Sequence, residues 1–325
     1  MENFAIIDLG SNSIRLEVDQ INDDASYQPI LEEKEVVRLS ENMGPENTLK
    51  RPAIDRTIEA IANFKSKFEN LPNLNIKAIC TAATRNATNQ AEFLEEVFDK
   101  TGIRLEVITG QQEAHYDYLG VINSLPIVNG IIMDTGGAST ELVLIQNSEE
   151  INAISIPQGA VTLTEAQLDT DVPSASQLFQ LFDHLNTIYN DIWWLNRGTN
   201  LPIIALGGSN RTLAKIKRRN DDTIKEWEDI HGFHMSIQEV KSIFINMLSS
   251  NLDERKNISG LSKERADIII GGLAPAMTLM RRLNSDRMIF SKRGVRFGIL
   301  HERLANVRNA NHAEDNSEET GPRFN

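Results

Sequence analysis

Two short segments carry nearly the same residues and suggest the same chemistry. Asp8-Leu-Gly-Ser-Asn-Ser13 and Asp134-Thr-Gly-Gly-Ala-Ser139 lie 126 residues apart, and in both an aspartate ends an apolar run. Glycine lets a backbone approach closely, and serine, asparagine and backbone N–H groups donate hydrogen bonds to oxygen-rich anions. A single loop of this kind also fits a plain type I′ turn. Because two copies share the pattern, we expect two phosphate-binding hairpins that face each other across a cleft.

Further groups suited to metals and anions follow strand-like segments. An aspartate at the end of a buried strand is costly unless it is paired or bound to a metal, so Asp8 and Asp134 are candidate ligands or water-orienting groups around Mg²⁺. A third glycine turn, Leu206-Gly-Gly-Ser-Asn210, connects a predicted strand to a predicted helix, whose N-terminus favours anions. A plain connection capped by Ser209 or Asn210 is the alternative.

Two charged residues lie where α/β folds form clefts. Glu113 stands near the start of a predicted helix, and its position fits either a functional site or a simple complement to the helix N-terminus. Arg85 lies in the segment just after the end of a predicted strand, a position that fits either a cleft or a surface ion pair. Spacing alone leaves both alternatives open.

Composition and charge exclude several classes of function. The net charge of −13 disfavours a general nucleic-acid binder, because such proteins present a broad basic face. No apolar run is long enough for a membrane span, so we expect a soluble, cytoplasmic protein without a membrane partner. The six histidines show no metal-ligand spacing, and the glycine spacings of dinucleotide-binding and Walker A loops are absent after the predicted strands.

Two basic clusters remain to be explained. Lys215-Ile-Lys-Arg-Arg219 fits a solvated helix end, where lysine and arginine are favoured. Ser291-Lys-Arg-Gly-Val-Arg296 follows a predicted strand and can extend a track for a long anionic chain. We expect Lys292 and Arg293 to contribute to such a track.

The elements that would position these groups repeat in order along the chain. The apolar patterns predict an α/β fold of two related domains with a cleft between them. We place the domains at 1–124 and 125–308, followed by a disordered acidic tail at 309–325. The predicted strands lie near 3–9, 14–20, 28–39, 75–80, 103–108, 130–134, 140–146, 151–156, 201–206 and 286–291, and the predicted helices near 52–68, before Gly102, from 111 and near 174–195.

Taken together, the ordered motifs resemble those of the exopolyphosphatase and guanosine pentaphosphate phosphohydrolase family, within the actin-like, sugar-kinase and heat-shock ATPase superfamily. The resemblance covers residues 4 to about 304. It implies duplicated actin-like (ribonuclease H-like) domains of the short two-domain type, and a homodimer. The motifs are Asp8-Leu-Gly-Ser-Asn-Ser-Ile-Arg-Leu16, Thr81-Ala-Ala-Thr-Arg85, Gly110-Gln-Gln-Glu-Ala114, Asp134-Thr-Gly-Gly-Ala-Ser-Thr-Glu-Leu142, Ile156-Pro-Gln-Gly-Ala-Val-Thr-Leu-Thr-Glu165, Leu206-Gly-Gly-Ser209, Glu264-Arg-Ala-Asp-Ile-Ile269 and Gly294-Val-Arg-Phe-Gly298.

The resemblance also implies a role for each candidate residue. Glu113 matches the family's catalytic glutamate, which orients or deprotonates water, and Asp134, Glu141 and Asp8 would hold Mg²⁺ or Mn²⁺ directly or through water. The expected reaction is hydrolysis of the terminal phosphate of inorganic polyphosphate, with guanosine pentaphosphate as the alternative substrate. The phosphate-binding residues would be Gly10, Ser11, Asn12, Ser13, Arg15, Arg85, Gly136, Gly137, Ala138, Ser139, Thr140, Gly207, Gly208 and Ser209.

Four positions depart from the usual pattern of that family. Ala138 replaces a glycine, which matters if the loop needs a positive φ or a close backbone approach. His115 and Thr162 stand where arginines are common, and Phe297 stands where a glutamate is usual. Because lost arginines weaken the grip on a polyanion, these departures leave open a polyphosphate- or nucleotide-binding sensor with weakened catalysis.

Overall fold

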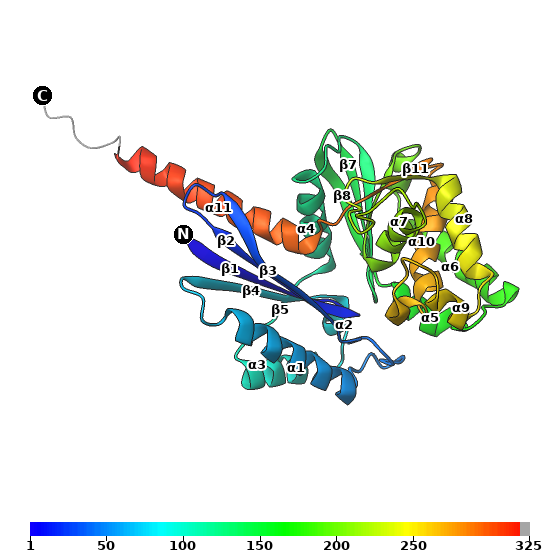
Figure 1. The fold of residues 1–325 in the computed structure, drawn as a ribbon, viewed down its shortest axis with the longest axis horizontal. Coiled ribbons are helices and arrows are strands. Elements are labelled where there is room, and N and C mark those ends of the chain that lie inside the picture. The colour runs from blue at the N-terminus through cyan, green and yellow to red at the C-terminus, as the bar shows by residue number, and fades with distance from the viewer. Residues whose placement is uncertain (319–325) are drawn as a thin grey trace, which may run out of the picture.

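Two mixed β-sheets organise the chain (Figure 1). The structure is a computed structural model that describes residues 1–318. The strand order is β3-β2-β1-β4-β5 in the first sheet and β10-β11-β9-β6-β7-β8 in the second. The strands are β1 (Glu2–Leu9), β2 (Ser13–Ile21), β3 (Tyr27–Val36), β4 (Leu74–Cys80), β5 (Glu106–Val107), β6 (Gly130–Thr135), β7 (Thr140–Gln146), β8 (Glu149–Ile156), β9 (Ile203–Leu206), β10 (His234–Ser236) and β11 (Arg287–Phe290).

The two sheets contain copies of one topological unit. β1 pairs antiparallel with β2, and β6 pairs antiparallel with β7. β1 and β6 also each take a parallel neighbour, β4 and β9 respectively. Within the hairpins Asp8 pairs with Arg15, and Asp134 pairs with Glu141. The prediction of an α/β fold built from a repeated unit is confirmed.

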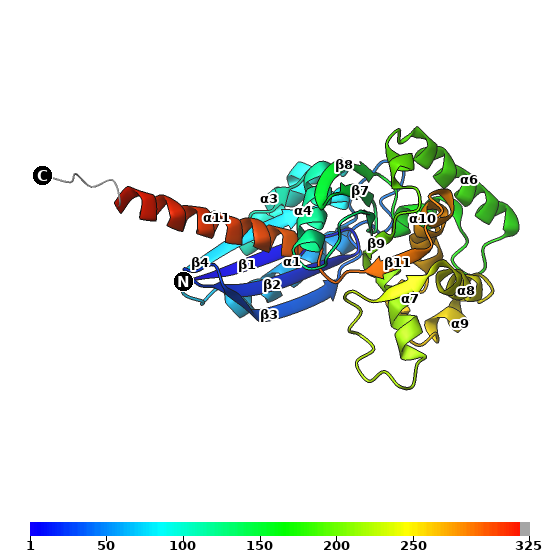
Figure 2. The same ribbon diagram turned by 90° about the horizontal axis from the view of Figure 1, so that it is seen from above.

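Helices cover both faces of each sheet (Figures 1 and 2). α1 and α3 pack on one face of the first sheet and α11 on the other, while α4 packs on one face of the second sheet and α5, α6, α7, α8 and α10 cluster on its other face. Within residues 1–318, no helix has both the length and the apolar character needed to cross a bilayer. The helices are α1 (Arg51–Phe68), α2 (Ala82–Arg85), α3 (Gln90–Thr101), α4 (Gly110–Ile122), α5 (Ala160–Gln167), α6 (Ala175–Asp191), α7 (Gly208–Arg219), α8 (Ile237–Leu248), α9 (Leu252–Lys256), α10 (Ile269–Arg282) and α11 (Val295–Glu318).

The two lobes meet where α4 crosses the start of α11. A Cβ on Gly120 would lie 2.5 Å from the carbonyl oxygen of Gly294, and a Cβ on Gly298 would overlap the backbone of Tyr116. Glycine at these positions therefore lets the two helices approach closely. Beyond this crossing, α4 packs on the second sheet and α11 on the first.

The crossing changes the predicted division of the chain. A boundary between 1–124 and 125–308 assigns α4 to the first domain and α11 to the second, which is the reverse of how these helices pack. The tail predicted from residue 309 begins within α11, which continues to Glu318. Adding turns to a helix that is already nucleated costs little free energy. The rest of the predicted tail, 319–325, lies outside the described residues.

Several element ends follow the predicted signals, and others do not. Pro52 lies in the first turn of α1, and Gly102 ends α3 with a φ of 70°, in the left-handed region. The strand predicted at 103–108 contributes only Glu106–Val107 to the sheet. The helix predicted near 174–195 ends at Asp191, and the sequence analysis does not predict α5 or β10.

Candidate active site

The β1–β2 and β6–β7 loops face each other across the cleft between the lobes. In each loop a glycine N–H donates to the carbonyl oxygen of a serine, from Gly10 to Ser13 at 3.1 Å and from Gly136 to Ser139 at 2.9 Å. A Cβ on Gly137 would lie only 2.9 Å from the Cβ of Ser11 in the opposite loop. Residues 11, 12, 137 and 138 all have negative φ values, so neither loop is a type I′ turn.

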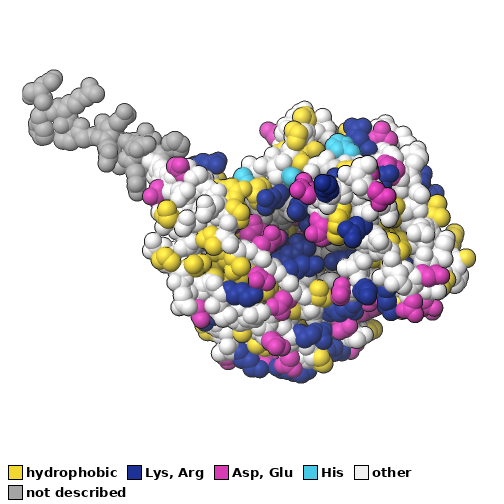
Figure 3. Space-filling view, in the orientation of Figure 1, with side chains coloured by type: hydrophobic (Ala, Val, Ile, Leu, Met, Phe, Trp, Pro, Cys, Tyr) yellow, Lys and Arg dark blue, Asp and Glu magenta, His cyan; other side chains and the backbone are white. Residues whose placement is uncertain are grey.

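A cavity of about 110 Å³ lies between the two loops, inside the hollow where lysine and arginine side chains gather in Figure 3. Residues from distant parts of the sequence line this cavity. Four residues predicted for the site, Arg85, Ala138, Thr140 and Ser209, do not line it. The predicted residues that line it are Asp8, Gly10, Ser11, Asn12, Ser13, Arg15, Glu113, Asp134, Gly136, Gly137, Ser139, Glu141, Gly207 and Gly208.

Arg85 and Thr140 support the site from behind the cavity wall. Arg85 Nη1 donates to the carbonyl oxygen of Ile108 at 2.9 Å and to Glu113 Oε2 at 3.2 Å. The hydroxyl of Thr140 donates to the carbonyl oxygen of Gln158 at 2.7 Å. Arg85 therefore orients a carboxylate of the site, while Thr140 ties β7 to the segment that follows β8.

Ser209 and Ala138 are both buried beside the cavity. The Ser209 hydroxyl lies so close to Gly272 of α10 that a Cβ there would overlap it. Ala138 has an ordinary backbone φ, so its extra methyl group causes no strain in the loop. The departure from the family pattern at this position is therefore compatible with the hairpin.

Helix α4 presents Glu113 to the cavity. Thr109 and Gln112 form a capping box, in which the Thr109 hydroxyl accepts from the Gln112 N–H at 3.1 Å and the Gln112 side chain accepts from the Thr109 N–H at 2.9 Å. Glu113 is therefore not needed as a cap. Burial raises the pKa of Glu113 well above its usual range, Glu141 raises it further, and Arg85 opposes the shift. A carboxyl group tuned in this direction suits a general base near neutral pH.

Asp134 and Glu141 are the carboxylates best placed to share a cation. They lie opposite each other in the β6–β7 hairpin and both line the cavity. Burial and then the charge of Asp134 raise the pKa of Glu141 to about 7, and the Ser155 hydroxyl donates to Glu141 Oε1 at 2.7 Å. Among residues 1–318, no three Asp, Glu, His or Cys side chains form a ready-made metal site. This pair nevertheless fits Mg²⁺, which keeps several waters and takes one or two carboxylates together with substrate phosphates.

Three arginines line the cavity, and the sequence analysis singles out only Arg15. Arg211 follows the third glycine turn, and Arg265 lies in a motif of the resemblance, so position relative to these motifs is the signal that points to them. The guanidinium of Arg265 occupies the space where a Cβ on Gly208 would lie. Burial lowers the pKa of Arg15 to about 9, and the charges of Arg211 and Arg296 contribute to this shift. Crowded cations of this kind are stabilised by a bound anion.

A buried carboxylate that the sequence analysis does not single out lies one helical turn beyond Glu113. Asp117 is fully buried, and neither of its oxygens has a hydrogen-bond partner among the described residues. A Cβ on Gly294 would lie 2.8 Å from Asp117 Oδ1 and 4.0 Å from Asp134 Oδ2. Burial and the charge of Asp134 raise the pKa of Asp117 well above its usual range. The i, i+4 spacing from Glu113 is the sequence signal that places both carboxylates on one face of α4.

We expect Asp117→Asn to stabilise the cation-free protein by about 1–3 kcal/mol near pH 8. Because the pKa of Asp117 is raised on folding, the folded state holds a proton that the unfolded state has already released, and stability falls as the pH rises above about 4. The substitution removes this cost, so the gain should disappear near pH 4.

Thermal unfolding in EDTA at both pH values measures the effect of Asp117→Asn. Asp222→Asn, at an exposed position, is the matched control. A variant that is less stable than the wild type near pH 8 would show that the Asp117 carboxylate has a stabilising partner.

The other three departures from the family pattern lie outside this cavity. His115 Nδ1 contacts Glu150 Oε2 at 2.6 Å on the surface. The Thr162 hydroxyl accepts from the Gly159 N–H at 2.8 Å and so helps to start α5. Phe297 is buried in the apolar cluster between the first sheet and α11. None of these side chains touches the cavity that holds Glu113.

The chain matches the model of the Ppx/GppA phosphatase family over residues 18–307. It therefore belongs to the Ppx/GppA phosphatase family. The resemblance drawn from the motifs is confirmed.

Solved structures share the fold of the chain. The Aquifex aeolicus member of the Ppx/GppA family is 30% identical, with a TM-score of 0.76 over 96% of this chain and 99% of that one. An exopolyphosphatase from Cytophaga hutchinsonii is 20% identical, with a TM-score of 0.85 over 94% of this chain and 98% of that one. These likenesses confirm the duplicated actin-like fold.

The curated relatives are longer than this chain. A guanosine-5'-triphosphate,3'-diphosphate pyrophosphatase from Vibrio cholerae is 27% identical over 94% of this chain and 60% of its own length. A bifunctional 3-dehydroquinate synthase/phosphatase from Fusobacterium nucleatum is 27% identical over 93% of this chain and 46% of its own length. The chain thus spans roughly half of the length of these relatives.

Proposed function

We propose that the protein is a Mg²⁺-dependent exopolyphosphatase that hydrolyses the terminal phosphate of inorganic polyphosphate. The observation that carries this proposal is the shared cavity, because Glu113, two glycine-serine hairpins and three arginines all line it. Hydrolysis of a phosphoanhydride needs alignment and charge stabilisation more than covalent participation by the enzyme. A carboxylate, backbone N–H groups and arginines supply both.

Each group has a distinct role in the proposed reaction. Glu113 orients the attacking water and accepts its proton, and Arg85 holds the Glu113 side chain in place. The hairpin N–H groups, the start of α7 and the arginines bind the phosphate oxygens. Asp134 and Glu141 would hold Mg²⁺ or Mn²⁺. When bound, such a cation neutralises charge on the phosphate oxygens.

Polyphosphate suits the surroundings of the site better than guanosine pentaphosphate. A nucleoside base usually binds among apolar and aromatic side chains. Two further cavities adjoin this one and share Arg15 and Arg211 with it. Of the described residues that line the three cavities, only His231 and Phe297 are aromatic, and the Arg293 guanidinium covers the Phe297 ring at 4.4 Å from its centroid. Guanosine pentaphosphate remains the second candidate because longer curated relatives are named for that activity.

The test is phosphate release with Mg²⁺ from long polyphosphate, guanosine pentaphosphate and ATP, measured side by side. We expect the highest kcat/KM on polyphosphate. Faster release from guanosine pentaphosphate would contradict the proposed substrate. Tight binding of polyphosphate without release would instead favour a sensor with weakened catalysis.

A further inference from the structure

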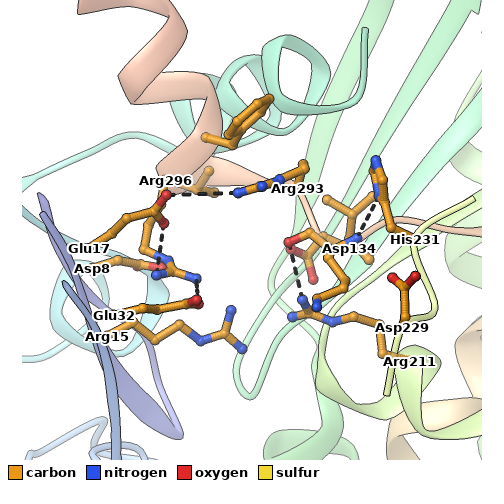
Figure 4. A pocket seen from close by; sticks show the side chains of 15 residues that line it. Asp8, Arg15, Glu17, Glu32, Asp134, Arg211, Asp229, His231, Arg293 and Arg296 are labelled. Carbon is orange, nitrogen blue, oxygen red and sulfur yellow. Dashed lines mark hydrogen bonds and ion pairs between the residues drawn. The ribbon is translucent and has the colours of Figure 1, made fainter. Parts of the chain in front are cut away.

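The active-site cavity adjoins two larger cavities that differ in charge. One, of about 300 Å³, lies along β3 and α7 and is called the β3–α7 trough here. The other, of about 280 Å³, lies at the start of α11 and is called the α11 branch (Figure 4). Arg15 and Arg211 line all three spaces and form their junction. A long substrate held at Glu113 therefore has two routes outward.

Positive charge is in excess in the β3–α7 trough, and its acidic side chains are already paired. Glu32 pairs with Arg296 at 3.3 Å. Glu33 pairs with Lys67 at 2.8 Å, and Glu228 pairs with Lys215 at 3.7 Å. The charged lining consists of the cations Arg15, Lys34, Arg211, Lys215, Arg265, Lys292 and Arg296 and the anions Glu32, Glu33 and Glu228.

Several trough cations lack an acidic partner. Among the side chains that the structure describes (those of residues 1–311), Arg15, Lys34, Arg265 and Lys292 make no ion pair with a carboxylate. Although Lys34 reaches solvent, partial desolvation and then the charges of Arg15 and Arg265 lower its pKa to about 8. Like charges gathered without direct ion pairs repel one another, so an anion bound among them is favoured.

The α11 branch, in contrast, is balanced in charge. Two of its four arginines are held by Glu17, with Arg296 Nη1 at 3.0 Å and Arg293 Nη1 at 3.9 Å (Figure 4). A polyanion that entered this branch would have to compete with these pairs. The charged lining consists of the cations Arg15, Arg211, Lys292, Arg293 and Arg296 and the anions Asp8, Glu17, Glu32, Asp134 and Asp229.

We propose that a polyphosphate chain with its terminal phosphate at Glu113 runs outward through the β3–α7 trough, contacts Lys34, and does not follow the α11 branch. The inference rests on the proposed function and names the binding site for the remainder of the chain. It keeps Lys292, which lines the trough, and replaces Arg293 with Lys34 in the sequence-based expectation of a track. A chain that passes the Arg15–Arg211 junction meets Arg265 and then Lys34, each without an acidic partner.

The experiment compares Lys34→Ala with Arg293→Ala, because each removes one positive charge from one route. Lys241→Ala, at an exposed position on α8, is the control. Phosphate release is measured on long polyphosphate and on tripolyphosphate, and binding of long polyphosphate is measured against salt concentration. We expect Lys34→Ala to lower kcat/KM roughly fivefold to tenfold on the long chain and less than about twofold on tripolyphosphate. The slope of log affinity against log salt should fall by about one.

The outcomes separate this inference from the proposed function. Equal losses on both substrates for Lys34→Ala, or a long-chain defect confined to Arg293→Ala, would overturn the trough while leaving the exopolyphosphatase intact. Binding of long polyphosphate without any phosphate release, weakened by Lys34→Ala, would overturn the proposed hydrolysis but support the trough. Binding that Lys34→Ala leaves unchanged in affinity and salt slope would overturn the trough whether or not phosphate is released.

Discussion

Replacing Glu113 with glutamine should lower the rate of phosphate release by about 10²- to 10⁴-fold and leave polyphosphate binding nearly unchanged. Glutamine keeps the size of the side chain and an oxygen that can accept from Arg85, which now donates to Glu113 at 3.2 Å. It cannot accept a proton from water. Because the loops and arginines carry the binding, the loss should fall on kcat and not on KM.

Phosphate release by Glu113→Gln and calorimetric binding of polyphosphate are measured on the same preparation. The matched control is Glu92→Gln, which makes the same change in the first turn of α3, at an exposed position. Retention of full activity would remove Glu113 from the catalytic role. A parallel loss of binding would mean that Glu113 holds the site together instead of acting on water.

The repeated hairpins were predictable because local patterns specify them, whereas the packing of α4 and α11 was not. A strand, a glycine turn and a second strand are encoded within about fifteen residues, so the apolar pattern suffices. Helix α4, however, buries residues on two sides, with Ala114 and Val121 against the second sheet and Tyr116 in the cluster of the first. When a helix has two apolar faces, its sequence does not show against which of the two sheets it packs.

The candidate site shows the same limit. Motif residues such as Ser139 and Glu141 line the cavity, but Thr140 between them does not, because successive strand residues point to opposite faces. Lys34 has no local signal beyond its charge, and only the tertiary structure brings its long side chain to the cleft beside Arg265. The homodimer, which came from the resemblance alone, and the metal, which came from the strand-end aspartates and the resemblance, stay predictions.

Replacing Arg15 with methionine should have opposite effects on activity and on stability. The variant loses a cation at the junction of all three cavities, so we expect kcat/KM on polyphosphate to fall about 10²- to 10³-fold. The pKa of Arg15 is lowered on folding to about 9, so in the anion-free protein the charged guanidinium costs free energy. This cost is fully present below about pH 9 and is lost as the pH rises toward the ordinary pKa of arginine.

Thermal unfolding near pH 7 tests this trade-off. Without anion, Arg15→Met should be more stable than the wild type by about 2 kcal/mol, after allowance for solvent screening. Tripolyphosphate should raise the melting temperature of the wild type more than that of the variant, because a ligand that binds the folded state more tightly stabilises it more. Arg281→Met, at an exposed position, is the control.

A less stable Arg15→Met protein without anion would mean that the attraction of Arg15 to Asp8 and Asp134 outweighs its burial and its repulsion from Arg211 and Arg296. A more stable Arg15→Met protein would show that the cleft is under electrostatic strain when no anion is bound. Bound phosphate would then relieve this strain, so that part of the affinity for a polyanion comes from the cost of leaving these arginines without one.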